Sequence, residues 1–121
     1  MKPKHIANRV AREYVRELRE FKGSNLYATS RMVGESLIYV VYSYGPHFPI
    51  YVAEQVRDPG TGQVQTHWYA NQNKYSQSTT RHQQQARPPY DVQIIPMDTD
   101  EMKMLAQGGL MRVVTEGVRH G

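Results

Sequence analysis

A polar stretch over residues 74–82, KYSQSTTRH, places hydroxyl side chains next to basic ones. Hydroxyls and free backbone N–H groups at the start of a helix form a common anion-binding arrangement, so this stretch is a candidate phosphate site. The alternative is a Ser/Thr-rich helix cap with exposed basic residues. No GxxxxGK[ST] pattern is present, so the stretch is not a P-loop. The candidate residues in it are Lys74, Tyr75, Ser76, Thr79, Thr80, Arg81 and His82.

The histidines are a second group of candidate metal ligands or catalytic residues. His47, His67 and His82 show none of the HxH, HxxxH or HExxH spacings that are typical of metal sites. They also lack the paired HxT or HxS motifs of cyclic-phosphodiester hydrolases. We therefore expect no metal, no cofactor and a non-enzymatic protein. A small hydrolase or nuclease that uses His67 or His82 is a weaker alternative, because such an enzyme needs a base and a partner carboxylate or metal.

Charge is distributed unevenly along the chain. Residues 59–90 contain no Asp or Glu, whereas Lys74, Arg81 and Arg87 lie inside this segment. A surface free of carboxylates is typical of proteins that face phosphate groups, and the alternative is a loop region of low charge. The whole chain has 15 Lys and Arg against 11 Asp and Glu, a net charge of +4. This balance permits a nucleic-acid partner and argues against an acidic DNA mimic.

Length and composition limit the remaining classes. A chain of 121 residues suits one domain with its own core. The absence of cysteine excludes disulfides, Cys-type zinc sites and a thiol nucleophile. The longest apolar run, residues 37–41, is too short to cross a bilayer, and the charged N-terminus lacks the apolar region of a secretory signal. We therefore expect a cytoplasmic protein with no membrane contact.

The N-terminal segment, residues 3–21, has the pattern of an amphipathic helix that ends at Lys22 and Gly23. Its apolar residues recur at helical spacing: Ile6, Val10, Tyr14, Leu18 and Phe21. A row of arginines projects roughly opposite to them: Arg9, Arg12, Arg16 and Arg19. Because glutamates are interleaved with the arginines, a solvated face is the expected role and a phosphate-binding face is the alternative.

The central region, residues 26–96, has the pattern of a sheet. Apolar and β-branched residues predict strands at residues 26–33, 37–44, 50–56 and 64–69. The second of these is apolar on nearly every position, which indicates a central strand covered on both faces. GPHFP predicts a turn or bulge after this strand, and DPGTG, residues 58–62, predicts a hairpin.

The C-terminal part predicts two short helices. The first covers residues 79–86, is capped by Ser76 or Ser78, and stops at Arg87-Pro88-Pro89. A strand follows at residues 92–95. Asp98 and Glu101 then form a capping-box pattern for a helix that reaches about Ala106 and ends at Gly108-Gly109. The tail could add a last strand at residues 110–115 or form a frayed end. The second helix and the tail together make up residues 97–121.

The predicted fold is therefore a single α+β domain over residues 1–121. It consists of an antiparallel sheet of four or five strands, an N-terminal amphipathic helix on one face, and two short C-terminal helices.

An ordered set of residues in the centre of the chain resembles a known family. The set is Tyr42-Ser43-Tyr44-Gly45, His47-Phe48-Pro49, Trp68, Asn71, Lys74-Tyr75-Ser76, Thr79-Thr80 and His82. It is similar to a family of small bacteriophage-encoded proteins of unknown function, over roughly residues 36–90. The resemblance implies a viral origin and an accessory role in the cytoplasm of an infected bacterium. It implies no mechanism.

Together these observations predict a phage accessory protein that binds nucleic acid or another phosphate-bearing ligand. The predicted surface comprises the His47 loop, the strand end at His67 and Trp68, and residues 74–87, including Arg87. Trp68 is either a core anchor, which is the expected role, or a stacking platform. The alternative function is a protein-binding inhibitor of a host defence or regulatory factor.

Overall fold

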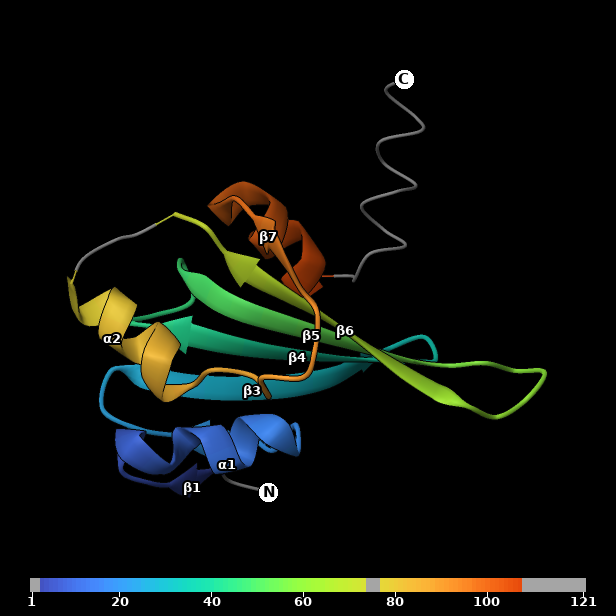
Figure 1. Cartoon of the computed structure of the whole chain (residues 1–121), viewed down its shortest axis with the longest axis horizontal. Helices are drawn as coiled ribbons and strands as arrows, with labels where there is room; N and C mark the ends of the chain where they lie inside the picture. The colour runs from blue at the N-terminus through green and yellow to red at the C-terminus, as the bar shows by residue number, and fades with distance from the viewer. Residues whose placement is uncertain (1–2, 74–76, 108–121) are drawn as a thin grey trace.

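The computed structural model describes residues 3–73 and 77–107, which form a seven-stranded sheet with helices on both faces (Figure 1). The strands are β1 (Lys4–His5), β2 (Phe21–Lys22), β3 (Leu26–Val33), β4 (Ser36–Ser43), β5 (Pro49–Arg57), β6 (Val64–Asn71) and β7 (Ile94–Met97). The helices are the 3-10 turn η1 (Asn8–Val10), α1 (Ala11–Arg16), α2 (Gln77–Gln85) and the helical residues 99–107. Strand order in the sheet follows chain order.

The sheet is mixed, so the predicted antiparallel sheet of four or five strands is wrong. Strands β2 to β6 are antiparallel neighbours, whereas β1–β2 and β6–β7 are parallel pairs. Strands β1 and β2 escaped prediction because strands of two residues carry no hydrophobic period. The strand predicted at residues 92–95 is displaced to β7, and α2 provides the crossover that a parallel return to β6 requires.

The four long strands were predicted correctly. Those expected at residues 26–33, 37–44, 50–56 and 64–69 correspond to β3, β4, β5 and β6, with ends that differ by at most two residues. The GPHFP turn joins β4 to β5, and the pairing register shifts next to it, between Val41 and Tyr42. Neighbouring strands joined by tight turns give a simple meander of antiparallel hairpins.

The predicted N-terminal helix over residues 3–21 is wrong. The structure places β1, η1, α1 and β2 in this range. The helix end expected at Lys22 and Gly23 is therefore absent: Lys22 belongs to β2, and Gly23 follows that strand. The spacing was misleading because each step of four residues advances a helix by about 40° more than one turn. Ile6 and Leu18, three such steps apart, would differ by about 120°, more than one apolar stripe accommodates.

Helix α1 ends in a Schellman motif. Leu18 adopts a left-handed backbone with φ of 55°. Its N–H donates to the Val15 carbonyl at 3.0 Å, and the Arg19 N–H donates to the Tyr14 carbonyl at 2.9 Å. These two bonds satisfy carbonyls that the helix end leaves free. The chain then turns back into the sheet at β2.

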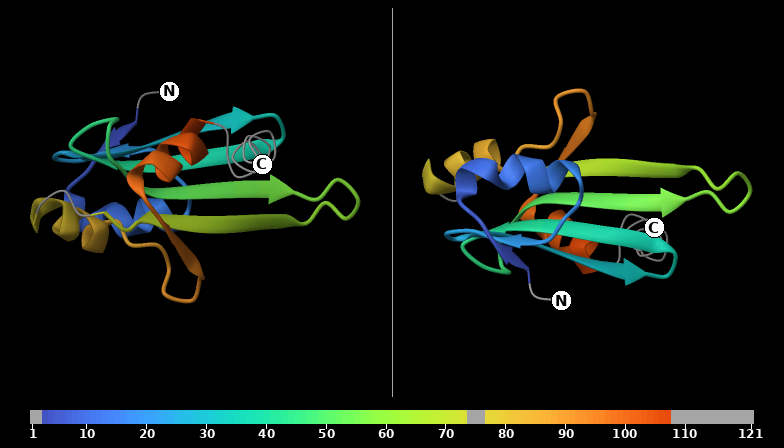
Figure 2. Two further views of the ribbon diagram at one scale, coloured as in Figure 1. Left: turned by 90° about the horizontal axis from the view of Figure 1, so that it is seen from above. Right: turned by 90° about the horizontal axis from the view of Figure 1, so that it is seen from below.

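The core has two layers, one on each face of the sheet. Helix α1 lies over one face and the helix at residues 99–107 over the other (Figure 2). The face under η1 and α1 buries Ala11, Tyr14, Val15, Phe21, Leu26, Ala28, Tyr39, Val41, Ile50, Tyr51, Ala53, Trp68 and Ala86. The opposite face, under the helix at residues 99–107, buries Ile38, Val40, Val52, Tyr69, Met102 and Leu105. Strand β4 contributes to both layers, as its apolar pattern predicted.

Two local turn predictions are confirmed. In the DPGTG hairpin, the Gly62 N–H donates to the Asp58 carbonyl at 2.8 Å, and Gly62 has the positive φ of 75° that favours glycine. In the capping box, the Glu101 N–H donates to Asp98 Oδ1 at 2.9 Å, and the Asp98 N–H donates to Glu101 Oε1 at 3.2 Å. The hairpin projects β5 and β6 well beyond the rest of the sheet (Figure 1).

Three predictions lie outside the described residues: the helix stop at Gly108-Gly109, the last strand at residues 110–115, and capping by Ser76. Ser78 does not cap α2 because it lies inside that helix. Within residues 3–73 and 77–107, no helix is long and apolar enough to cross a membrane.

Candidate functional site

Helix α2 is held on the protein largely by polar contacts, because its sequence QSTTRHQQQ contains no apolar residue. Tyr51 Oη donates to the Gln83 carbonyl at 2.7 Å, and Gln83 Nε2 donates to the Asn71 carbonyl at 2.9 Å. On the other side, Arg12 Nε donates to the Gln84 carbonyl at 2.9 Å. The helix therefore joins the end of the sheet to α1, two regions far apart in the sequence.

On the inner side of α2, the buried Ser43 and His82 lie beside the exposed Tyr44, and these three residues are here called the His82 cluster. Ser43 Oγ and His82 Nδ1 are hydrogen-bonded at 2.7 Å, and the two residues are 1% and 5% exposed. The Tyr44 ring lies 5.3 Å from the imidazole, and its left-handed backbone (φ 69°) is fixed by a bond from its N–H to the Asn25 carbonyl. Burial, and then the charge of Arg81, lower the pKa of His82, which favours the neutral imidazole.

A hydroxyl bonded to a neutral imidazole has the form of a nucleophile and its base. Within the described chain, no carboxylate is hydrogen-bonded to the His82 imidazole, so the third member of a catalytic triad, which would orient the ring, is missing there. A cavity of about 220 Å³ adjoins the pair and is lined by Ser43, Tyr44, Gly45, His47 and Phe48. The arrangement suits the anchoring of α2 better than catalysis, because both polar atoms are buried and satisfied.

The three histidines do not converge. His47 is exposed and lies beside the cavity at the Ser43 end of β4. His67 is exposed on β6. In the register of the sheet it lies opposite Glu54 of β5, and Glu54 lies opposite Ile38 of β4. Five residues along β4 separate Ile38 from Ser43, about 17 Å of strand. No group of three potential metal ligands exists among the residues that the structure describes.

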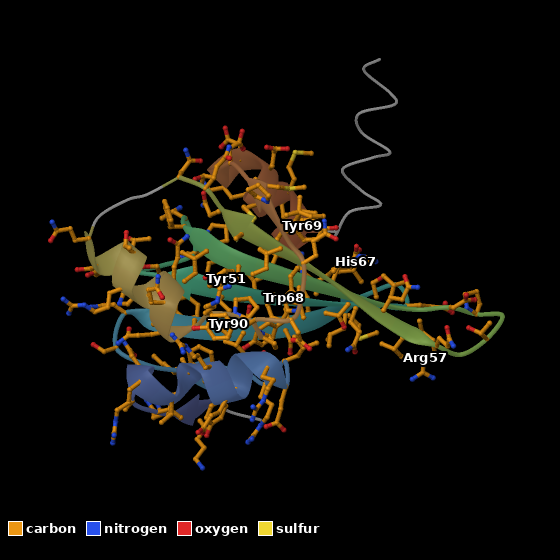
Figure 3. All side chains as sticks on the ribbon, viewed as in Figure 1. Tyr51, Arg57, His67, Trp68, Tyr69 and Tyr90 are labelled. Atoms are coloured by element: carbon orange, nitrogen blue, oxygen red, sulfur yellow. The ribbon has the colours of Figure 1, made fainter. Side chains whose placement is uncertain are left out.

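Beyond the C-terminal end of α2, residues from two distant segments form a second cluster. Arg12, Arg16, Arg87 and Tyr90 line a cleft of about 290 Å³ and are here called the arginine–tyrosine face. The guanidinium carbon of Arg87 lies 4.4 Å from the Tyr90 ring centroid, and that of Arg12 lies 5.9 Å away. Tyr90 is 72% exposed, the most of any large hydrophobic residue that the structure describes. Figure 3 shows it where the chain leaves α2, next to α1.

Arg12 and Arg87 also lie close enough to the neighbouring Tyr51 to influence its pKa. Burial raises the pKa of Tyr51 to about 12, and the positive charges of both arginines oppose that rise. In the described parts of the chain, no carboxylate forms an ion pair with Arg12, Arg16 or Arg87. Glu13 also lines the cleft, so this surface is not entirely free of carboxylates.

The residues predicted from sequence occupy different environments. Arg81 is exposed on α2, Arg87 is half-buried, Thr79 is buried and Thr80 is partly buried. Trp68 is 4% exposed and packs edge-on against Tyr39, with ring centroids 6.4 Å apart, so it belongs to the core. Lys74, Tyr75 and Ser76 lie outside the described residues, and with them the start of the predicted anion site.

The most exposed residue of the arginine–tyrosine face was not predicted as a site residue. Tyr90 directly follows Pro88 and Pro89, and an aromatic side chain after two prolines is held on a stiff backbone outside regular structure. That signal is present in the sequence. The partners Arg12 and Arg16 were expected on a solvated helix face, and only the tertiary structure brings them to Arg87.

Several residues of the ordered set that resembles phage proteins meet at one end of the sheet. Ser43 bonds His82, the Ser43 N–H donates to the Phe48 carbonyl at 3.1 Å, and Asn71 Nδ2 donates to the Pro49 carbonyl at 3.0 Å. No protein-family model matches the chain, and no curated protein or solved structure is significantly similar to it. The family resemblance therefore stays a prediction.

Proposed function

We propose that the chain is a non-enzymatic phage accessory protein that binds nucleic acid through the arginine–tyrosine face, with Arg81 on the adjoining helix extending the contact. The phage origin is supported by the resemblance alone. The binding function is supported by one observation. Helix α1 and the segment after α2, joined by the Arg12–Gln84 hydrogen bond across 72 residues of sequence, place three arginines without ion pairs in one cleft with the exposed ring of Tyr90.

This grouping suits a polyanion for two reasons. Arginine binds phosphate oxygens through a planar fork of N–H donors and stays charged at all relevant pH values. Cations that no carboxylate neutralises retain their full field, and each one that meets a phosphate releases condensed counterions. Glu13 weakens this field at one side of the cleft, which leaves a net excess of two positive charges among its lining residues: three arginines minus one glutamate.

A protein partner is the alternative that the same experiment tests. A protein partner would need exposed aromatic anchors, for which Phe48 and Trp68 are the candidates on the surface predicted from the sequence. Because Trp68 is buried, only the half-buried Phe48 can contact a partner without unfolding the core. On the arginine–tyrosine face itself, the excess of positive charge supports a polyanion as the proposed ligand.

The test is a salt titration of binding to short labelled DNA and RNA, single- and double-stranded. With three arginine contacts, the slope of log affinity against log salt should be roughly −2 for single strands and −3 for duplexes. Arg16→Gln should flatten the slope by just under one unit, because Arg16 makes no hydrogen bond that the fold needs. Arg57→Gln makes the same charge change near the distant hairpin tip and serves as the control (Figure 3).

Two results would contradict the proposal. One is the absence of binding to all four ligands at low salt, which would favour a protein partner. The other is an equal effect of Arg16→Gln and Arg57→Gln, which would indicate that net charge, and not this face, determines affinity.

A further inference from the structure

We infer that the arginine–tyrosine face takes single-stranded nucleic acid, with one base stacked on the Tyr90 ring and the backbone phosphates on the arginines. This inference rests on the proposed function and specifies its ligand. It depends on three features of the face: the exposure of the ring, the hollow shape of the site, and the spacing of the cations.

The ring is exposed and yet held in position. Tyr90 is 72% exposed, while Arg87 stacks on it at 4.4 Å and Pro88 before it is buried. A fixed aromatic ring in water loses little conformational freedom when a base stacks on it. Stacking tolerates any base, because every base has a π face. The bases of a duplex already stack on one another, so a duplex can offer one to the ring only at its ends or by unpairing.

The shape of the site also disfavours a duplex. Readers of the major groove insert a protruding helix, but this face is a cleft of about 290 Å³ between α1 and the segment from Arg87 to Tyr90. Helix α1 has only six residues and buries one side against the sheet. Its length of about 9 Å leaves it unable to act as a recognition helix. A flexible strand can enter such a cleft, with a base turned inward against Pro88 and Pro89.

The cations are spaced to follow a backbone. Arg12 and Arg16 are four residues apart on α1, so they lie on one face of the helix as neighbours. Arg87 lies across the cleft from them. Phosphates on either side of a stacked base can therefore each meet a guanidinium, which combines the cationic groove and the aromatic platform typical of single-strand binders.

The experiment measures the affinity of three labelled probes of one length by fluorescence anisotropy: an oligothymidine, a matched duplex, and an abasic strand that keeps the phosphates without bases. The single strand should bind more tightly than the duplex at equal salt. Tyr90→Ala should weaken binding of the single strand by about 5- to 150-fold, the range for loss of one stacked base. Tyr90→Phe keeps the ring and should stay within about twofold of the wild type, because stacking needs no hydroxyl.

The abasic strand separates the inference from the function on which it rests. Tyr90→Ala should leave its binding unchanged, whereas Arg16→Gln should weaken it. Equal losses on the abasic strand and the oligothymidine after Tyr90→Ala, or a duplex bound as tightly as the single strand, would overturn the inference while nucleic-acid binding stands. Failure of all three probes to bind would overturn both. A melting curve of each variant tests whether it is folded. We expect the Tyr90 variants to be folded because Tyr90 lies outside both core layers.

Discussion

Helix α2 and the segment that follows it use polar residues in opposite ways. On the inner side, His82 is 5% exposed and bonded to Ser43, with its imidazole kept neutral by burial. Past the C-terminal end, Arg87 lies against the open ring of Tyr90, which is 72% exposed. One short polar segment thus supplies both the anchor of a helix and part of a surface for a ligand.

The difference teaches that polarity alone does not separate structural from binding residues. A helix with no apolar side chain can dock only through hydrogen bonds, so part of its polar sequence is needed for the fold itself. The residues left for a ligand are those that stay exposed and whose charge no carboxylate neutralises, such as Arg12 and Arg16. Burial and bonding, which the sequence does not show, decide between the two roles.

The largest expected effect follows from removing the anchor. His82→Ala deletes a buried ring and leaves the Ser43 hydroxyl without its partner, so the free energy of unfolding should fall by about 2–4 kcal/mol. Chemical denaturation at pH 7 measures the loss. Affinity for nucleic acid, measured where the variant is still fully folded, should change little, because His82 is not part of the arginine–tyrosine face.

A loss below about 0.5 kcal/mol would show that His82 does not anchor α2, since that is the scale of an ordinary surface substitution. Ser43→Ala is the matched variant from the other side of the bond. It should cost less than His82→Ala because it removes one oxygen and no ring.

A smaller effect is expected from pH. Because the pKa of His82 is lowered in the folded state, the unfolded chain takes up a proton at higher pH than the folded chain does. The stability contributed by the neutral imidazole is therefore complete above the unfolded value of 6.5 and is lost as pH falls below it. Unfolding of the wild type at several pH values between 8 and 5, compared with His82→Gln, measures this contribution.

The wild type should lose more stability than His82→Gln over that interval. Parallel curves for the two proteins would contradict the prediction, because the remaining histidines are present in both. The comparison isolates one side chain and does not require the pKa values of the others.

Much of the central fold was predictable because its signals are local. The DPGTG turn and the Asp98–Glu101 capping box each define a backbone geometry within a few residues. Strands β3 to β6 are long enough to show their pattern. The N-terminal region failed because apolar residues spaced by four mimic a helical stripe, while the left-handed Leu18 and two-residue strands follow from contacts distant in sequence.

The candidate site was predictable only in part. The absence of carboxylates from residues 59–90 pointed to the segment that contains α2, Arg87 and Tyr90. It did not show that His82 would be buried, that Trp68 would join the core, or that Arg12 would cross to Gln84. Those outcomes depend on how the elements pack, which a pattern along one chain does not record.

The smallest expected effect concerns the influence of the exposed side of α2 on its buried side. Arg81 is the exposed neighbour of His82, and its charge is one of the two causes that lower the pKa of that histidine. Arg81→Gln should change stability at pH 7 by less than about 0.5 kcal/mol, as is usual for an exposed position. Its stability should, however, fall less steeply than that of the wild type as the pH decreases below 6.5, because protonation of His82 no longer meets that charge. Arg57→Gln, which makes the same charge change far from His82, should follow the wild-type curve. If both variants flatten the curve equally, the net charge of the protein is responsible, and the proposed link between the exposed and buried sides of α2 is wrong.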